Sequence, residues 1–236
     1  MLAELFQELD ARITRFDLLC HPFYQAWEAG LLTPDDLRAY ACEYYHHVAA
    51  FPTYLSALHA RLDDGPSRRA VLRNLVGEEL AGRAHSELWL DFAEALGAGR
   101  DQARRSTPVA EVAALIASFR QLAREAPPVQ AVAAFYAYES QVPRIAAVKA
   151  QGLRDRYGVS AAGRAYFTLH ATADVEHAAA WKVEMERMLA AEPASADSVL
   201  QAAEAAAAQL WRALDGIERG RCLRNASTAG SSPTIQ

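Results

Sequence analysis

The chain has 236 residues, of which 52% are hydrophobic, and its formal net charge at pH 7 is −5. This length and composition allow a single domain with a substantial core, and the scattered lysines and arginines lack the basic stripe of a nucleic-acid-binding protein. No apolar run approaches the roughly 20 residues of a membrane span, and the acidic N-terminal segment lacks the basic start of a signal peptide. The three cysteines have no zinc-type spacing, which favours reduced thiols. We therefore expect a cytoplasmic protein without a nucleic-acid or membrane partner.

Apolar residues recur at helical spacing along the chain, and no stretch shows the period-2 alternation of a strand. We therefore predict an all-α bundle of about seven or eight helices. Helix boundaries follow capping and breaking signals, such as Thr33-Pro34 at a helix start and the Gly65-Pro66 and Pro127-Pro128 pairs between helices. The predicted helices run over residues 2–16, 22–30, 34–62, 66–97, 108–124, 128–151, 160–190 and 195–220.

Two prolines fall inside predicted helices, and the composition changes at the C-terminal end. Pro143 lacks the N–H that would bond the carbonyl of Glu139, which predicts a kink there, and Pro52 predicts a similar kink. Residues 223–236 are small and polar, with too little apolar surface to offset the entropy lost on ordering. We therefore expect one domain over residues 1–222 and a disordered tail over residues 223–236.

The most informative segment places His170, Asp174 and His177 at positions i, i+4 and i+7 of a predicted helix. At about 100° per residue these three side chains share one face. Upstream, Glu78 and His85 are seven residues apart in another predicted helix, and seven residues return a helix to within about 20° of its starting direction. Each of the two predicted helices therefore presents its potential metal ligands on one face.

Glu139 completes a set of three carboxylates and three imidazoles, a mixture of oxygen and nitrogen donors that suits iron or manganese better than calcium or thiolate-bound zinc. Inward-facing carboxylates are costly in a bundle unless a metal or base pairs with them. Glu79 and Glu176 point about 100° away from the ligand face and are not expected to bind metal. His46 and His47 also point about 100° apart, so core or surface roles are expected for them. The sequence therefore predicts a two-metal, oxygen-activating site formed by Glu78, His85, Glu139, His170, Asp174 and His177.

The spacing Glu-x6-His, a central Glu and His-x3-Asp-x2-His resembles the di-metal oxidase branch of the haem-oxygenase-like (TenA/PqqC-like) bundles. Within that branch, the sequence is most similar to the CADD-like family, named after the chlamydial protein associating with death domains, over roughly residues 5–190. Common di-iron bundles instead repeat Glu-x-x-His on two helices. The resemblance implies two divalent metals, Fe/Fe or Mn/Fe, with O2 as co-substrate and an external reductant. Thiaminase-II-like and pyrroloquinoline-quinone-synthase-like proteins share the fold without needing such metals.

In the CADD-like family, the protein supplies para-aminobenzoate for folate synthesis by consuming an internal tyrosine, and a lysine is implicated as amino donor. By this resemblance, Tyr24 is the ring source and Lys149 the amino donor, while Tyr40 and Tyr166 match tyrosines that line the site. The residues themselves say less, since most tyrosines of a helical protein lie at the edge of the core. Lys149 is nevertheless one of two lysines in the chain, and an amine can be deprotonated and used as a nucleophile. Such bundles commonly pair, so a homodimer is expected.

Three alternatives to this self-sacrificing hypothesis stay open. A multiple-turnover oxidase or oxygenase would act on a diffusible amine, amino acid or fatty acid and leave Tyr24 intact. A non-enzymatic protein-interaction module would keep its partner after loss of all the metal ligands. A metal-free cofactor synthase would use the six-residue cluster as a polar pocket. The self-sacrificing hypothesis leads because a side chain fixed beside the metals needs no separate binding event.

Overall fold

The computed structural model describes residues 2–80 and 82–229. These residues form helices and short 3-10 turns with no strand among them, which confirms the all-α prediction. No helix within the two ranges is long and apolar enough to cross a membrane. The helices are α1 (Leu2–Thr14), α2 (Pro22–Ala29), α3 (Pro34–Arg61), α4 (Pro66–Leu80), α5 (His85–Ala95), α6 (Arg100–Arg105), α7 (Ala110–Glu125), α8 (Pro128–Glu139), α9 (Val142–Asp155), α10 (Ala165–Ala191) and α11 (Ala196–Ala229), with 3-10 turns η1 (Leu18–Cys20), η2 (Ala162–Arg164) and η3 (Pro193–Ser195).

Local sequence signals start and stop several helices as predicted. Thr33 forms a capping box with Asp36, because its hydroxyl accepts the Asp36 N–H at 3.2 Å while the Asp36 carboxylate accepts the Thr33 N–H at 3.0 Å. Pro34 occupies the first turn of α3, where a backbone N–H would have no helical partner and the missing N–H of proline costs nothing. Gly30 ends α2 with a φ of +74°, a left-handed conformation that favours glycine.

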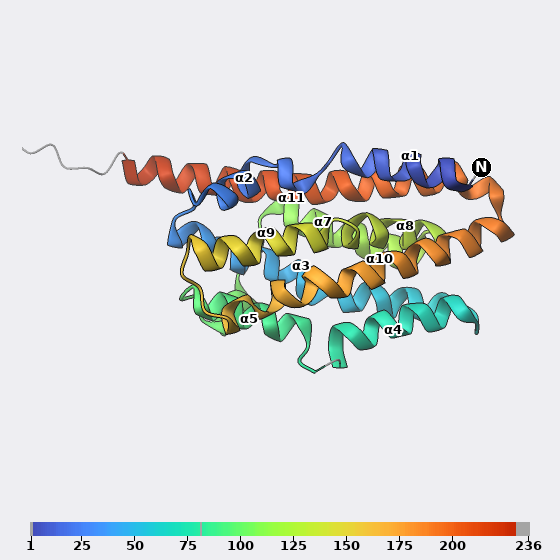
Figure 1. The fold of residues 1–236 in the computed structure, drawn as a ribbon, viewed down its shortest axis with the longest axis horizontal. Coiled ribbons are helices and arrows are strands. Elements are labelled where there is room, and N and C mark those ends of the chain that lie inside the picture. The colour runs from blue at the N-terminus through green and yellow to red at the C-terminus, as the bar shows by residue number, and fades with distance from the viewer. Residues whose placement is uncertain (1, 81, 230–236) are drawn as a thin grey trace, which may run out of the picture.

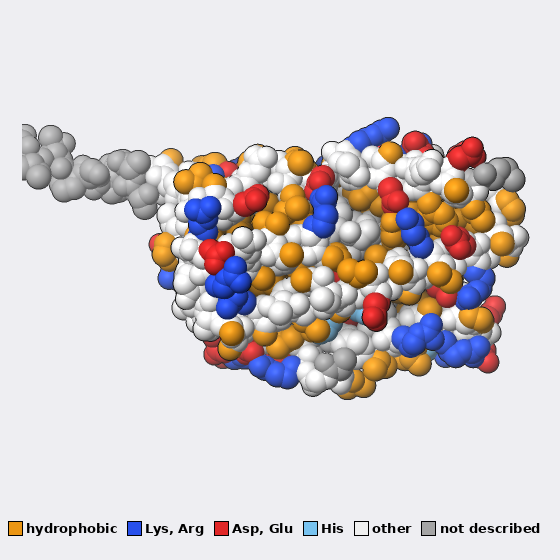
Figure 2. Space-filling view, viewed as in Figure 1, with side chains coloured by type: hydrophobic (Ala, Val, Ile, Leu, Met, Phe, Trp, Pro, Cys, Tyr) orange, Lys and Arg blue, Asp and Glu red, His pale blue; other side chains and the backbone are white. Residues whose placement is uncertain are grey.

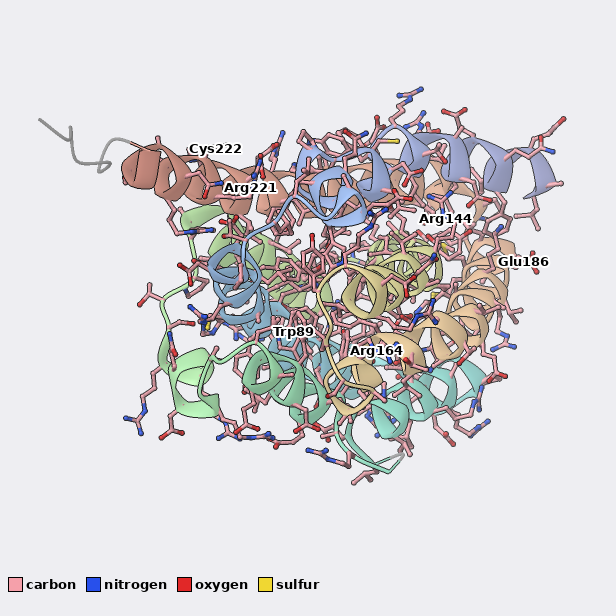
Figure 3. All side chains as sticks on the ribbon, turned by 60° about the vertical axis from the view of Figure 1, so that its left-hand side comes forward. Trp89, Arg144, Arg164, Glu186, Arg221 and Cys222 are labelled. Carbon is pink, nitrogen blue, oxygen red and sulfur yellow. The ribbon has the colours of Figure 1, made fainter. Side chains whose placement is uncertain are left out.

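The bundle is arranged around three long helices, α3, α10 and α11. In Figure 1, α1 lies along α11 on one side of the molecule, and α4 and α5 lie on the opposite side. Helix α11 also packs on α7 and α8, α10 packs on α8 and α9, and α3 packs on α4, α5 and α7. The interior holds several large, fully buried aromatic side chains, and Figure 3 shows one of them, Trp89, inside the bundle. On the face drawn in Figure 2, acidic and basic side chains are interspersed, and a small area of histidine reaches the surface.

The prediction of one continuous helix over residues 66–97 is wrong, because the chain breaks between α4 and α5. Gly82 has a φ of +89°, which most side chains avoid, and it lies between the end of α4 at Leu80 and the start of α5 at His85. Glu78 therefore lies in the last turn of α4, and His85 is the first residue of α5. These two residues do not share the face of one helix, and it is the break that brings them together.

The predicted helix over residues 128–151 is also divided. Helix α8 ends at Glu139 and α9 starts at Val142, so the expected kink at Pro143 is a complete break at Ser140 and Gln141. Pro143 lies in the first turn of α9, where its missing N–H costs no helical hydrogen bond. Pro52 does lie inside α3, as predicted. The two breaks, together with the unpredicted short helix α6, explain why the bundle has more helices than expected.

Helix α11 continues to Ala229, past residue 222, where the sequence analysis ends the domain. Residues 223–229 contain no glycine or proline that would stop a helix. In addition, the Arg224 guanidinium lies 3.2 Å from the fully buried carboxylate of Asp36, which ties this end of α11 to the start of α3. The rest of the predicted disordered tail, residues 230–236, lies outside the described residues.

Candidate active site

The predicted metal ligands gather in two adjoining groups where α4, α5, α8 and α10 meet. Potential ligand atoms of Glu78, His85 and His170 all lie within 4.8 Å of one another. Atoms of Glu78, Glu139 and His177 form a second group within the same limit. Glu78 belongs to both groups, so its carboxylate lies where it can serve both metals of a two-metal centre. All five of these residues are buried except His177, which is 19% exposed.

Asp174, the sixth predicted ligand, joins the cluster through His177. Its Oδ1 atom lies 3.1 Å from His177 Nδ1, which donates a hydrogen bond to it. Asp174 also lines a cavity of about 10 Å³ together with Glu78, Glu139 and His170. A space of this size between the potential ligands has room for one ion or one small molecule such as water.

The electrostatics of the cluster favour a cation. Burial, together with the charges of Asp174 and Glu78, raises the pKa of Glu139 to about 8. Burial alone would lower the pKa of His177, but its hydrogen bond to Asp174 and the charge of Glu139 raise that pKa to about 9. The cluster therefore holds a protonated imidazole among carboxylates, a position in which a divalent cation would replace the proton.

The imidazoles of the first group are also suited to a metal. His170 Nδ1 lies 2.7 Å from the backbone carbonyl of Tyr166 and donates to it, which leaves Nε2 with a free lone pair. His85 Nδ1 lies 2.9 Å from Glu78 Oε2, within ion-pair distance, but this buried nitrogen has no well-formed hydrogen bond among the described residues. A buried imidazole nitrogen that faces a carboxylate oxygen in this way fits a site that binds a metal.

Three further predicted residues, Tyr24, Tyr40 and Lys149, form a triad next to this cluster. Lys149 Nζ donates hydrogen bonds to Tyr24 Oη at 2.8 Å and to Tyr40 Oη, and the two hydroxyl oxygens are 3.2 Å apart. The three side chains are buried and line a cavity of about 30 Å³. The structure therefore brings Tyr24, Tyr40 and Lys149 together, although they come from α2, α3 and α9.

Burial controls the protonation of this triad. Desolvation lowers the pKa of Lys149 well below its usual value, because a charged ammonium loses its hydration on burial. The ring centroids of Tyr24 and Tyr40 lie 4.0 and 4.5 Å from Nζ. Burial also raises the pKa of the Tyr24 phenol, with a smaller opposing effect from its hydrogen bond to Tyr40. The triad therefore consists of protonated phenols and a lysine whose neutral amine form is favoured by burial.

Two tyrosines lie between the triad and the potential metal ligands. Tyr138 and Tyr166 line both the 30 Å³ cavity and the 10 Å³ cavity. Tyr166 is a predicted site residue, and the structure places its ring against that of His170, with the centroids 4.0 Å apart. Tyr138 was missed, although it directly precedes Glu139 in the sequence.

The sequence analysis also missed two further residues that line the larger cavity, Tyr44 and Trp89. Helical spacing could have found both, because Tyr44 follows Tyr40 by one turn and Trp89 follows His85 by one turn. Four residues that were not expected to bind metal lie outside the cluster. Glu79 and Glu176 are exposed, His46 contacts Ser106 at 2.9 Å, and His47 is buried among aromatic rings.

An all-helical bundle that gathers carboxylates and imidazoles into two adjoining buried groups is typical of metal-binding helical proteins. Residues 38–211 match the model of a family described as iron-containing redox enzymes, and the chain belongs to this family. The family and the two ligand groups together support a metal cofactor.

Similar proteins agree with this assignment. The chain is 39% identical to the 4-aminobenzoate synthase of Chlamydia pneumoniae over 89% of its own length and 92% of that protein. It is also 39% identical to the 4-aminobenzoate synthase of Nitrosomonas europaea over 92% of both chains. The predicted resemblance to the CADD-like family is therefore confirmed.

Solved structures show the same fold at low sequence identity. A TenA homologue from Pseudomonas syringae superimposes with a TM-score of 0.77 at 18% identity, covering 92% of each chain. A CADD-like protein of unknown function from Nostoc punctiforme gives a TM-score of 0.71 at 16% identity, covering 92% of this chain and 98% of that one. These likenesses confirm the predicted haem-oxygenase-like bundle.

Proposed function

We propose that this chain makes 4-aminobenzoate by consuming its own Tyr24, with Lys149 as the amino donor. The observation that carries the proposal is the enclosed contact of Lys149 with Tyr24 beside the cluster of potential metal ligands. Activation of O2 is the chemistry that two bound metals, Fe/Fe or Mn/Fe, would supply, with electrons from an external reductant. The residues that would hold these metals are Glu78, His85, Glu139, His170, Asp174 and His177.

The positions of Tyr24 and Lys149 support this chemistry. The ring and carboxyl carbon of 4-aminobenzoate correspond to the ring and Cβ of a tyrosine, so the Cα–Cβ bond has to break and Cβ has to be oxidised to a carboxyl group, with O2 as the oxidant. The phenolic oxygen must also leave as water in exchange for the nitrogen of Lys149, whose Nζ–Cε bond has to break by oxidation at Cε and hydrolysis, with O2 again as the oxidant. Lys149 Nζ lies 2.8 Å from the phenolic oxygen, and burial lowers its pKa, which favours the neutral, nucleophilic form of the amine. Tyr40 accepts a second hydrogen bond from Nζ and so orients the amine.

The size of the cavity favours an internal substrate. Its volume of about 30 Å³ holds about two water-sized molecules, too little for a separate aromatic or fatty acid. Side chains that are already in contact also need no binding step, which removes much of the entropic cost of bringing reactants together. These two points support self-sacrifice over a multiple-turnover oxidase acting on a diffusible substrate.

Tyr138 and Tyr166 complete the enclosure between the triad and the metal ligands. Both are buried, and burial raises the pKa of each hydroxyl well above its usual value. They therefore stay protonated, and their burial keeps both side chains away from bulk water. This enclosure protects a reactive site from side reactions with solvent.

The test is reconstitution of the apoprotein with iron, manganese, reductant and O2, followed by analysis of the small-molecule product and of the mass at Tyr24 and Lys149. We expect no more than about one 4-aminobenzoate per chain, with matching loss of Tyr24, because each substrate side chain can be used once. Tyr24→Phe should abolish the product and keep the metal content. The matched control is Tyr54→Phe, which removes a buried hydroxyl that has no described partner and lines neither cavity.

Continued product formation by Tyr24→Phe would contradict the assignment of the ring source. Consumption of O2 by the loaded wild-type protein, with Tyr24 and Lys149 intact and no product, would instead indicate an oxidase that acts on an external substrate.

A further inference from the structure

Glu139 is held by two hydrogen-bond donors that lie outside the predicted ligand set. Its carboxylate, at the end of α8, is 1% exposed. Asn74 Nδ2 lies 3.1 Å from Glu139 Oε1 and 3.3 Å from Oε2. Trp181 Nε1 donates a hydrogen bond to Oε2. The two donors come from α4 and α10, so the Glu139 carboxylate at the end of α8 is hydrogen-bonded to both of these neighbouring helices.

The donors leave the two oxygens of Glu139 in different situations. Oε2 receives the indole N–H of Trp181 and one contact from Asn74. Oε1 faces the cluster of potential metal ligands, because it lies 3.7 Å from Nδ1 of His177. Oε2 therefore has two protein donors, whereas Oε1 has only the Asn74 N–H, at 3.1 Å, and is directed toward the group formed by Glu78, Glu139 and His177.

Helical spacing couples both donors to ligands. Asn74 precedes Glu78 by four residues in α4, and Trp181 follows His177 by four residues in α10. Residues four apart lie on one face of a helix, one turn from each other. Each of these helices therefore supplies a ligand and, one turn away, a donor that orients the ligand of a third helix, Glu139.

The orientation of Asn74 indicates that the contact has a purpose beyond packing. Its side chain is 4% exposed, and its Oδ1 atom has no hydrogen-bond partner in the part of the chain that the structure describes. Leaving a buried carbonyl unpaired is unfavourable. Turning the amide over would place this oxygen against the oxygens of Glu139, so the observed orientation is the one that suits Glu139 as a carboxylate, the form in which it would bind a metal.

We propose that Asn74 and Trp181 are positioning residues that fix Glu139 as a ligand of the second group, Glu78, Glu139 and His177. The first group, Glu78, His85 and His170, does not include Glu139 and does not depend on them. Metal-binding carboxylates are commonly held by such hydrogen bonds, and loss of one typically lowers metal affinity by about 10- to 100-fold. The proposal rests on the metal centre of the proposed function and is independent of the tyrosine chemistry.

The experiment is titration of the apoprotein with Mn²⁺, with free Mn²⁺ measured by electron paramagnetic resonance. We expect Trp181→Phe and Asn74→Leu each to weaken one of two sites by about 10- to 100-fold and to leave the other site unchanged. The matched control is Trp211→Phe, because Trp211 packs against His21 instead of a predicted ligand. The same titration of Tyr24→Phe should match that of the wild type, which separates this proposal from the proposed product.

Two further comparisons distinguish positioning from loss of packing. Asn74→Ala and Asn74→Leu differ in volume but both lack the N–H donor, so equal weakening in the two variants supports the proposal. Circular dichroism of each apoprotein shows whether the helices are retained, and Asn74→Leu carries the test if Trp181→Phe does not fold. Two sites of wild-type affinity in the folded variants would overturn the proposal, and so would equal weakening of both sites.

Discussion

The stability of the protein should depend on pH through His47, a buried imidazole in α3. Its side chain is fully buried, and neither ring nitrogen has a hydrogen-bond partner among residues 2–80 and 82–229. The rings of Tyr138 and Phe119 pack around it, with centroids 5.0 and 5.5 Å away. Burial lowers the pKa of His47 to about 3, because a charged imidazolium is poorly solvated among aromatic rings.

The size of the effect follows from proton linkage. In the unfolded chain a histidine titrates near pH 6.5, so between that pH and about pH 3 the unfolded state binds a proton that folded His47 does not. The free energy of unfolding therefore falls as the pH falls through this window and becomes independent of His47 below it. At pH 5 the loss, relative to pH 8, is about 2 kcal/mol, from about 1.4 kcal/mol per pH unit for one proton.

Urea unfolding of the wild type and His47→Phe at pH 8 and pH 5 measures this effect. Phenylalanine suits the aromatic surroundings and does not titrate, so the variant should lose about 2 kcal/mol less than the wild type between the two pH values. Tyr54→Phe is the control, because Tyr54 packs against His47 at 6.0 Å and its phenol stays protonated at both pH values. An identical change for the wild type and His47→Phe would refute the reasoning and indicate that His47 gains a proton or a polar partner in the folded protein.

Two further predictions concern the active site. Lys149→Met should keep the metal content and form no 4-aminobenzoate. Lys149→Arg, which buries a permanently charged group, should in addition lower the melting temperature. Product chromatography measures the yield and thermal unfolding measures the melting temperature, and an unchanged yield from Lys149→Met would remove the amine from the proposal. Metal binding must displace the protons of His177 and Glu139, whose pKa values are raised to about 9 and about 8, so the Mn²⁺ affinity of the apoprotein should rise by about tenfold to a hundredfold per pH unit between pH 6 and pH 8. An affinity that is independent of pH over this range, measured by calorimetry, would contradict the view that a protonated His177 occupies the cluster.

The two halves of the predicted ligand set show how far sequence reasoning reached. His170, Asp174 and His177 lie on one continuous helix, so the argument from helical spacing holds for them. Glu78 and His85 were grouped by the same argument, but Gly82 breaks the chain between them. Their convergence therefore depends on the turn and on the packing of α4 and α5, and a periodicity argument does not describe either.

Three residues of the site could not be predicted from the sequence, for one shared reason. Asn74, Trp181 and Tyr138 are ordinary residues of amphipathic helices when seen in the sequence. Their contacts with Glu139 or with the two cavities are made across helices. An asparagine or tryptophan gains such a role through its neighbours in space, and those neighbours are set by how the helices cross.

The sequence by itself determined the all-α class and the chemical identity of the candidate site. Both depend on local information, because helical periodicity repeats every few residues and donor types are properties of single side chains. The tertiary structure decided that Lys149 Nζ meets Tyr24 Oη, two atoms whose residues are 125 positions apart. It also decided that Asn74 and Trp181 meet Glu139, since contacts between distant segments arise from the packing of whole helix faces and not from the spacing of residues within one helix.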